Sequence, residues 1–326
     1  MIHSDVLIVG GGPAGAACAW ALRRRGLDVL ILDRATFPRL KLCAGWITPE
    51  VLEDLAIGPG DYPHALTTVR RLVVSVRGLR LRLPTRQLAI RRVEFDDWLL
   101  QRSGARVIQH HAREITEHNG GYVVDGEFFG RYLVGAGGTH CPVARTFFAD
   151  VNPRSADGLI VTQEEEFAYP HETDGAGNAC HLWFFERGLP GYAWYVPKAE
   201  GFVNVGVGGK EETLKRRGQT IKDHWLHLVA ALDDLGLVKN YDFAPEGHAY
   251  YVRKGEEPQL RVGNAFLVGD AAGLATSDMG EGIAPAVRSG LLVAEAIATD
   301  QSIDVRRIRR WSQPRLMAWL LARGYG

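Results

Sequence analysis

The sequence predicts an α/β protein in which a Rossmann-like dinucleotide-binding domain is interleaved with a mostly antiparallel β-sheet domain. Near the N-terminus, an apolar run of strand length (5–9) stops at three glycines and continues as a helix-period segment of small residues (16–22). This is the pattern of a strand, tight turn and helix that binds a dinucleotide. Later stretches alternate apolar and polar residues or are rich in aromatic residues, as antiparallel strands are. Because the two patterns alternate along the chain, neither domain is expected to be continuous.

The first turn has the form G-x-G-x-x-G, with Gly10, Gly12 and Gly15 at its three glycine positions. Gly10 permits the turn, Gly12 lets backbone approach a pyrophosphate, and Gly15 lets the helix lie close to the strand. A second apolar strand ends on Asp33, whose carboxylate can accept hydrogen bonds from an adenosine ribose. The stretch therefore predicts nucleotide binding, but it does not decide between a flavin and a nicotinamide.

The remaining elements are predicted in order from local patterns. We expect helices at 48–53, 90–100, 211–235 and 281–298, a hairpin over 69–83 that turns near Gly78, strands at 131–135 and 261–268, and a β-rich, aromatic region over 158–251. These elements predict a discontinuous nucleotide-binding domain of residues 1–66, 86–155 and 255–326. The antiparallel, substrate-binding domain would comprise residues 67–85 and 156–254.

Composition excludes several classes of protein. The 326 residues include 38 basic and 38 acidic side chains, and this zero net charge argues against a nucleic-acid binder. The four cysteines are widely spaced without a Cys-x-x-Cys pair, so neither a zinc site nor a disulfide framework is expected. His110, His111 and His181 have no metal-ligand partners at useful spacing, so no metal is predicted.

The same features predict where the protein works. Residues 1–4 lead straight into the first strand, which leaves no room for a signal peptide, and no run of about 18 apolar residues could span a bilayer. We expect a cytoplasmic protein whose membrane contact, if any, is peripheral. Residues 306–310 are mostly arginine and precede an apolar stripe. They predict a basic C-terminal helix that either touches an anionic membrane or packs on the protein.

Four stretches resemble flavoprotein oxidoreductases of the para-hydroxybenzoate hydroxylase fold, and within them the geranylgeranyl reductase family. These stretches are residues 10–15 with Asp33, residues 38–45, Arg92 with residues 95–96, and residues 269–273 followed by 280–283. The resemblance implies FAD, with its pyrophosphate at residues 12–15, its ribose at Asp33, Arg92 near the phosphates and its ribityl chain at Asp270. The residues that it places at the cofactor are Gly10, Gly12, Pro13, Ala14, Gly15, Asp33, Arg34, Lys41, Cys43, Ala44, Gly45, Arg92, Gly137, Gly269, Asp270, Gly280, Gly282 and Ile283.

A fifth stretch resembles the substrate-pocket signature of the geranylgeranyl reductases. It is Tyr192-x-Trp194-x-Val-Pro, followed after eight residues by Gly206-x-Gly208. Tyr192 and Trp194 share one face of a strand, and the two glycines share a face of another, so they can line a slot for an isoprenoid chain. Packing within the core of a sheet is the alternative. Cys43 matches a cysteine near the reacting face of the flavin, and Trp46 lies in the same loop.

These features predict an FAD-dependent oxidoreductase that transfers hydride from reduced flavin to carbon–carbon double bonds of a lipophilic, isoprenoid-type substrate. Cys43 and Tyr192 are the catalytic candidates, and Cys43, Trp46, Tyr192, Trp194, Gly206 and Gly208 are the substrate-binding candidates. The sequence places no histidine or glutamate for proton transfer. An FAD-dependent aromatic hydroxylase or monooxygenase is the first alternative, and a non-catalytic flavin redox carrier or binding protein is the second.

The electron donor is left open by one departure from the family pattern. Gly137 stands where many relatives carry an aspartate, and the missing carboxylate weakens the inference that NADPH reduces the flavin. NADPH, NADH and a reductase or reduced carrier protein are therefore all retained as expected donors.

Overall fold

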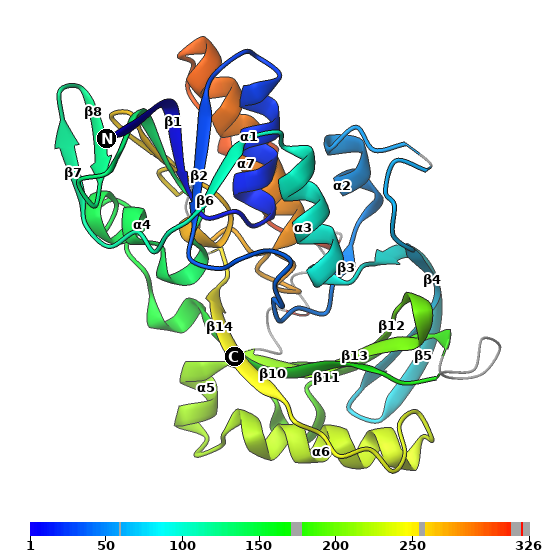
Figure 1. Cartoon of the computed structure of the whole chain (residues 1–326). Helices are drawn as coiled ribbons and strands as arrows, with labels where there is room; N and C mark the ends of the chain where they lie inside the picture. Colours follow the sequence, from blue (N-terminus) through cyan, green and yellow to red (C-terminus); the bar gives the residue numbers. More distant parts are fainter. Residues whose placement is uncertain (59, 171–177, 254–257, 314–320, 322–326) are drawn as a thin grey trace.

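The computed structural model describes residues 1–58, 60–170, 178–253, 258–313 and 321. Within these residues the chain forms two sheets of eight strands each, and the first sheet with its helices lies above the second (Figure 1). One sheet is largely parallel and the other largely antiparallel, which confirms the predicted fold class.

The first sheet has the order β15-β16-β9-β1-β2-β6, with β7 and β8 attached through β9. β1, β2, β6, β9 and β16 run parallel, so their carboxyl ends meet at one edge. Alternate residues of β1 enter two different hydrophobic cores, as expected for a parallel sheet covered on both faces. The strands are β1 (Ile2–Val9), β2 (Val29–Asp33), β6 (Arg106–Gln109), β7 (Ile115–His118), β8 (Gly121–Val124), β9 (Phe128–Gly135), β15 (Arg261–Val262) and β16 (Ala265–Leu267).

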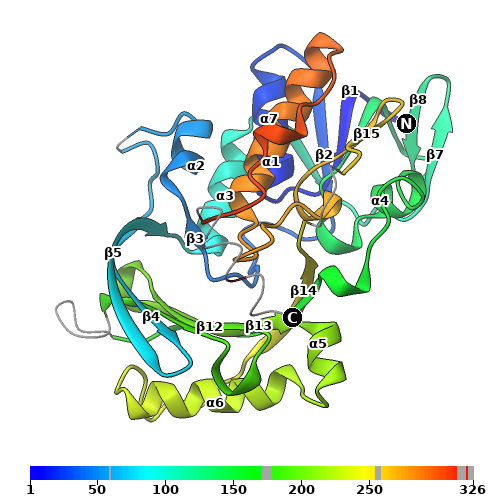
Figure 2. The ribbon, with the colours of Figure 1, turned by 180° about the vertical axis from the view of Figure 1, so that it is seen from behind.

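Three helices cover one face of this sheet: α1 (Pro13–Arg23), α3 (Arg92–Arg102) and α7 (Ile283–Thr299). The other face is covered by α4 (Pro142–Phe147) and the β7–β8 hairpin (Figure 2). α1 and α7 pack at backbone distance, because a Cβ on Gly290 would lie only 2.4 Å from the Ala14 carbonyl oxygen. The two helices that start near the glycine-rich segments are therefore held side by side.

The second sheet has the order β14-β10-β13-β12-β11-β4-β5-β3, and only its β11–β4 pair is parallel. Trp46 in β3 pairs with Ala89 in β5. Residues 46–47 and 86–89 of this sheet thus lie outside the range 67–85 predicted for the substrate-binding domain, and the predicted domain boundaries remain a proposal. The strands are β3 (Trp46–Ile47), β4 (Thr67–Val76), β5 (Leu79–Ala89), β10 (Leu159–Ala168), β11 (Cys180–Phe184), β12 (Gly191–Pro197), β13 (Phe202–Lys210) and β14 (Glu246–Tyr251).

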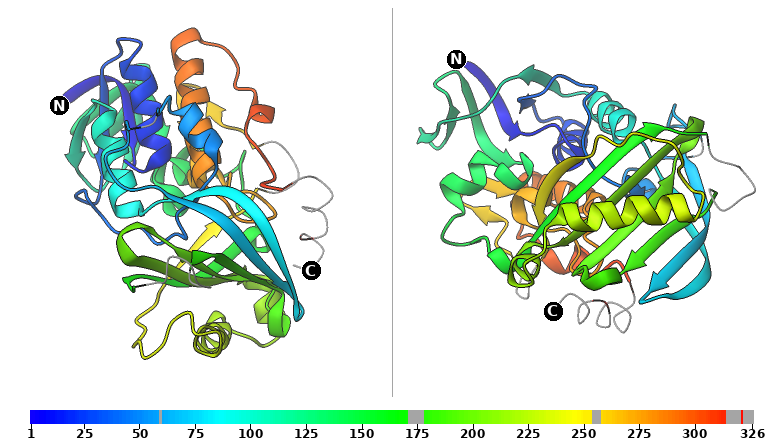
Figure 3. Two further views of the ribbon diagram at one scale, coloured as in Figure 1. Left: turned by 90° about the vertical axis from the view of Figure 1, so that its right-hand side faces the viewer. Right: turned by 90° about the horizontal axis from the view of Figure 1, so that it is seen from below.

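Helix α6 (Ile221–Asp234) covers the face of this sheet that points away from the first sheet (Figure 3). Its Trp225, Leu228 and Leu232 pack against alternate residues of β12 and β13. The opposite residues of the same strands, Trp194 and Val196 among them, belong to a separate core on the other face. Two short helices complete the described chain: α2 (Pro49–Asp54) and α5 (Glu211–Arg216).

Two predicted elements were wrong in detail. The single helix expected over 211–235 is two helices, because Gly218 adopts a left-handed φ of +64° and Thr220 starts α6 with a capping box. The strand expected over 261–268 is the tight hairpin β15–β16, because Gly263 has a φ of +56°. In both places a glycine interrupts an apolar pattern that reads as continuous.

The C-terminal prediction falls largely outside the described residues, which omit 314–320 and 322–326. Among the basic residues 306–310, which are described, the chain forms a short 3₁₀ turn at Val305–Arg307 and no α-helix. No helix of the described chain is long and apolar enough to cross a membrane.

Candidate active site

The glycine turn after β1 requires its glycines because the backbone passes close to other backbone. Gly10 has a φ of +113°, and a Cβ there would lie 2.3 Å from the Ala136 oxygen. A Cβ on Gly15 would lie 2.0 Å from the Gly10 oxygen. Gly12 is the N-cap of α1 without a side-chain cap, and Pro13 and Ala14 begin the helix. The N-terminus of α1 therefore presents backbone, with no capping side chain, to this edge of the sheet.

Asp33 lies at the end of β2 and is bound to the same turn. Its carboxylate accepts hydrogen bonds from the backbone nitrogens of Gly11 (2.7 Å) and Ala35 (2.8 Å). Arg34, the next residue, is exposed. The carboxylate thus orders the glycine turn, in addition to any contact with a ligand.

Gly137 and Asp270 follow the next two parallel strands at this edge. Gly137 ends the turn after β9, where a Cβ would contact Cys141. Gly269 has a φ of +57°, and a Cβ on it would lie 3.0 Å from the Ala14 Cβ, so the Asp270 turn packs directly against α1. The structure thus brings the predicted turns of four strands together, as in nucleotide-binding sheets.

The predicted helix start near Gly280 is observed at Ile283. Gly282 is the N-cap of α7, so Asp270 does not cap this helix. A Cβ on Gly282 would lie 3.3 Å from the Asp270 carboxylate. The N-terminus of a helix of 17 residues therefore faces the same region as Asp270.

The loop of residues 38–45 lies beside α3. Arg92 is buried and makes two hydrogen bonds of 2.7 Å to Asp96, which also lies 3.4 Å from Arg39. The Cys43 sulfur accepts a hydrogen bond from the Gly45 nitrogen (3.4 Å) and lies beside Arg92. Two nitrogens of the Arg92 guanidinium are already hydrogen-bonded to Asp96. Arg92 could therefore contact a phosphate only while it keeps this ion pair.

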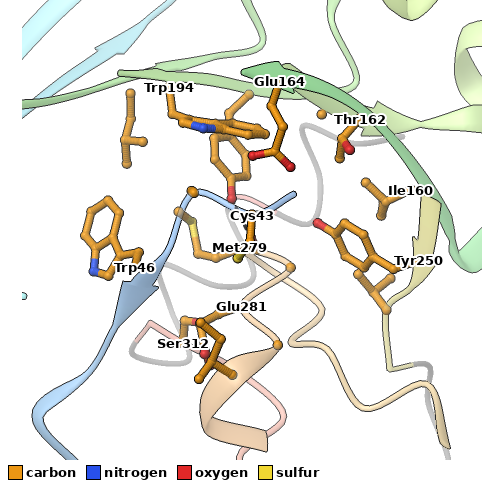
Figure 4. A pocket seen from close by; sticks show the side chains of 18 of the residues that line it. Cys43, Trp46, Ile160, Thr162, Glu164, Trp194, Tyr250, Met279, Glu281 and Ser312 are labelled. Atoms are coloured by element: carbon orange, nitrogen blue, oxygen red, sulfur yellow. Dashed lines mark hydrogen bonds between the residues drawn. The ribbon is translucent and has the colours of Figure 1, made fainter. Parts of the chain in front are cut away.

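A large cavity lies between the antiparallel sheet and the start of α7 (Figure 4). It holds about 1160 Å³ of empty space, part of it open to solvent. Residues of β10, β12 and β13 form what we call the sheet wall, and residues 277–283 form the loop wall. The predicted residues that line the cavity are Cys43, Ala44, Trp46, Tyr192, Trp194, Gly208, Gly280, Gly282 and Ile283.

Gly206 has a different position from Gly208. It does not line the cavity, because the Trp194 indole lies over it: a Cβ on Gly206 would be 2.2 Å from that ring. The indole nitrogen donates a hydrogen bond of 2.7 Å to the Asn204 side chain. Gly206 thus lets the aromatic ring lie flat on the sheet, and Trp194 itself faces the cavity.

The Tyr192 hydroxyl is already engaged. It donates a hydrogen bond of 2.6 Å to the Met279 carbonyl oxygen on the loop wall. Burial, with Cys43 and Asp278 nearby, raises the pKa of the Tyr192 phenol. The phenol is therefore a weak acid here and holds the two walls together.

Two further glutamates line the cavity, the buried Glu164 and the half-buried Glu281, and neither is among the predicted site residues. Burial raises the pKa of Glu164 on the sheet wall to about 7, and burial likewise raises that of Glu281 on the loop wall to about 7. Glu281 accepts a hydrogen bond of 2.7 Å from the Ala284 nitrogen. The Asn204 side chain lies beside the Glu164 carboxylate and favours its charged form, but burial has the larger effect on the pKa.

His248 lies next to Glu164, with Nδ1 3.2 Å from the carboxylate. Burial and the nearby cations Lys41 and Arg92 lower the pKa of His248 to about 3, so the imidazole is neutral at pH 7 and this contact is not an ion pair. Thr162 lies 2.6 Å from the same nitrogen. The strand register, which the sequence does not reveal, places Glu164 opposite Gly206 and Thr162 opposite Gly208.

Comparisons with known proteins show the family of the chain. A family model described as FAD dependent oxidoreductase matches residues 5–94. A protein of Methanopyrus kandleri named digeranylgeranylglycerophospholipid reductase 2 is 30% identical over 95% of this chain and 82% of its own length. The chain belongs to the geranylgeranyl reductase family of FAD-dependent oxidoreductases.

Other similarities agree with this membership. Menaquinone reductase of Mycobacterium tuberculosis is 29% identical to this geranylgeranyl reductase family member. The match covers 99% of the present chain and 81% of the menaquinone reductase. A solved structure of a geranylgeranyl bacteriochlorophyll reductase-like protein from Thermoplasma acidophilum has a TM-score of 0.78 at 21% identity, covering 99% of this chain and 83% of that one. The second similarity supports the fold.

Proposed function

We propose that this FAD-dependent oxidoreductase reduces carbon–carbon double bonds in the isoprenoid chain of a lipid. The observation that carries the proposal is the cavity, whose sheet wall combines Tyr192, Trp194 and bare backbone at Gly208 with apolar neighbours. Flat aromatic rings beside bare backbone fit a long alkyl chain better than a compact polar substrate. The printed names of two relatives, a digeranylgeranylglycerophospholipid reductase and a menaquinone reductase, are consistent with such a substrate.

We further propose that FAD extends from the glycine turn to the N-terminus of α7. The absence of Cβ atoms at Gly10, Gly12 and Gly15 fits a pyrophosphate on the α1 N-terminus, next to Asp33. At the other end, Asp270 and Gly282 are adjacent, which fits the ribityl chain and flavin ring of the same molecule. Bound FAD supplies hydride-transfer chemistry at the cavity.

Residues 38–45 would close the site around that ring. This loop contains the predicted cofactor residues Lys41, Cys43, Ala44 and Gly45, and the exposed Arg34 precedes it. Gly45 has a φ of +64°, and a Cβ on it would lie 2.2 Å from the Lys198 side-chain nitrogen. The loop therefore packs on a buried lysine, which fixes its path. This supports a role for Cys43 as a contact between cofactor and substrate.

Reduction of a double bond also needs a proton, and Glu164 is our candidate to hold it. The carboxyl group is fully buried beside the cavity with a pKa of about 7, so a large fraction is protonated near neutral pH. Cys43 stays a candidate for the final transfer. Tyr192 is assigned to positioning, because its hydroxyl already donates a hydrogen bond to the Met279 carbonyl oxygen.

The proposal is tested by anaerobic single turnover. FAD-loaded protein is reduced with dithionite and mixed with geranylgeranyl-bearing lipids, and both flavin reoxidation and the saturation of the lipid are followed, the latter by mass spectrometry. Loss of a double bond coupled to flavin reoxidation is expected. A flavin that no prenyl lipid reoxidises would contradict the proposal, and a hydroxylated aromatic product formed with oxygen would establish the monooxygenase alternative.

A further inference from the structure

The hairpin of β4 and β5, residues 67–89, carries a row of exposed leucines. Leu79, Leu81 and Leu83 are 64%, 47% and 44% exposed. They pair across the strands with Val76, Val74 and Leu72 respectively, and residues directly opposite in a pair share one face. Exposed apolar side chains in such a row are unusual on a protein surface that faces only water.

The row continues into the substrate cavity. Leu72, Val74 and Val76 pack against the core cluster that contains Leu182 and Trp194, and these two residues line the cavity. The exposed leucines of the hairpin and the apolar residues of the cavity wall thus form one continuous apolar surface. The hairpin forms one edge of the second sheet, and its turn points away from α1 and α7 (Figures 1 and 3).

The hairpin is also strongly basic. Residues 67–89 contain no acidic side chain, and one nearby carboxylate, Glu186, meets the turn by accepting a hydrogen bond of 3.0 Å from the Gly78 nitrogen. Across the described residues, none of the hairpin arginines has a side-chain hydrogen bond or ion pair. All are exposed: Arg70, Arg71, Arg77, Arg80, Arg82 and Arg86.

We propose that hairpin 67–89 docks the protein on an anionic bilayer. The leucines enter the boundary between headgroups and acyl chains. Arg80 and Arg82 alternate with the leucines along β5 and so extend from its other face. In the described residues β3 pairs only with Leu88 and Ala89, so an edge-on approach along residues 79–87 brings both faces to the bilayer, with the arginines at anionic headgroups. Exposed cations and exposed leucines along one free strand edge match a bilayer in both charge and polarity, whereas an acidic protein partner would match the arginines alone. If the proposed function is correct, the apolar face also offers a lipid chain a continuous path into the cavity, but docking itself does not depend on it.

The test measures co-sedimentation of the full FAD-loaded chain with phosphatidylglycerol-containing vesicles at low salt, without turnover. Arg80→Gln with Arg82→Gln is expected to lower partitioning about 25-fold, since each cation near an anionic surface contributes about a fivefold factor. Leu79→Glu is expected to abolish binding. The matched controls are Arg106→Gln with Arg113→Gln on the first sheet's side and Leu226→Glu on α6, where Leu226 is 67% exposed.

Binding that is lost in the hairpin variants and kept in both controls would support the proposal. It would be overturned by absence of vesicle binding, by equal loss in the controls, or by loss only in Arg306→Gln with Arg309→Gln, which would assign the contact to the C-terminal segment. Hairpin variants that change only the oligomeric state in the absence of vesicles would instead indicate a second copy of this chain. Turnover of detergent-dispersed lipid, measured separately, reports the proposed function alone.

Discussion

Replacement of Glu164 by glutamine tests the most unusual group of the cavity. The side chain is fully buried, and its pKa rises from an ordinary 4.5 to about 7 because of burial. Between these two values the folded protein keeps the proton while the unfolded chain loses it, so stability falls as pH rises through this window. The full cost above the folded pKa is roughly 3 kcal/mol, at 1.36 kcal/mol for each pH unit.

Glu164→Gln removes that cost because an amide does not ionise. The variant is expected to be about 3 kcal/mol more stable than the parent at pH 8, with the difference shrinking toward zero at pH 4.5. Urea unfolding of the FAD-loaded proteins at a series of pH values measures this. If Glu164 holds the transferred proton, single-turnover reduction in the variant is slower by about 10²–10⁴-fold. The parent rate declines above pH 7, and the variant rate does not.

The control is Glu246→Gln, because Glu246 lies opposite Glu164 in the β10–β14 pair but is exposed. It should change neither the stability profile nor the rate. A stability difference between Glu164→Gln and the parent that is the same at every pH would refute the reasoning. A pH-dependent stability difference without any change in the turnover profile would leave Glu164 structural and move the proton to Cys43.

Three further substitutions follow from close contacts. Gly206→Ala places a methyl group against Trp194, so stability should fall by about 1–3 kcal/mol and KM for a prenyl lipid should rise more than kcat changes. Gly15→Ala sets a Cβ 2.0 Å from the Gly10 oxygen and should lower the ratio of bound flavin to protein, measured by absorbance. Lys198→Met breaks a buried ion pair and should cost roughly 3–5 kcal/mol in urea unfolding.

Each of these has a contradicting result. An unchanged KM in Gly206→Ala would show that the Trp194 indole does not contact the substrate. An unchanged ratio of flavin to protein in Gly15→Ala would show that the close approach at Gly15 does not contribute to flavin binding. A neutral Lys198→Met would show that Glu166, 3.4 Å from the lysine, is accommodated without it. Gly247→Ala serves as a glycine control, since the φ of Gly247 is not positive and the nearest atom to an added Cβ lies at an ordinary contact distance of 3.4 Å.

The nucleotide-binding half was predictable because its signals are local. The turn after β1 needs glycine at positions fixed by its own backbone, and Asp33 follows directly from the end of an apolar strand. Parallel strands then bring their carboxyl ends to one edge whatever lies between them in sequence. It was the resemblance to the reductase family that placed Asp270 on the same cofactor as Gly12, although more than two hundred residues separate them.

The acid chemistry of the cavity was not predictable, because it depends on register. Glu164 is one of three consecutive glutamates, and the sequence alone does not tell which faces the cavity. Pairing of β10 with β13 places it opposite Gly206, where the absent side chain leaves room for the carboxyl group. The breaks at Gly218 and Gly263 were not predicted for a similar reason. Each of these glycines interrupts its helix or strand because its φ is positive, and the apolar pattern around it does not reveal that φ.

The hydrogen bond from Tyr192 to Met279 joins two walls that are 87 residues apart in sequence. It fixes the height of the cavity at that point by the length of one tyrosine side chain. A flexible polyisoprene can lie beside such a crossing, whereas a thick fused-ring lipid would have to break it. Discrimination by ligand thickness would then reside in one directional contact, and Tyr192→Phe would widen the range of accepted lipids while leaving the aromatic surface in place.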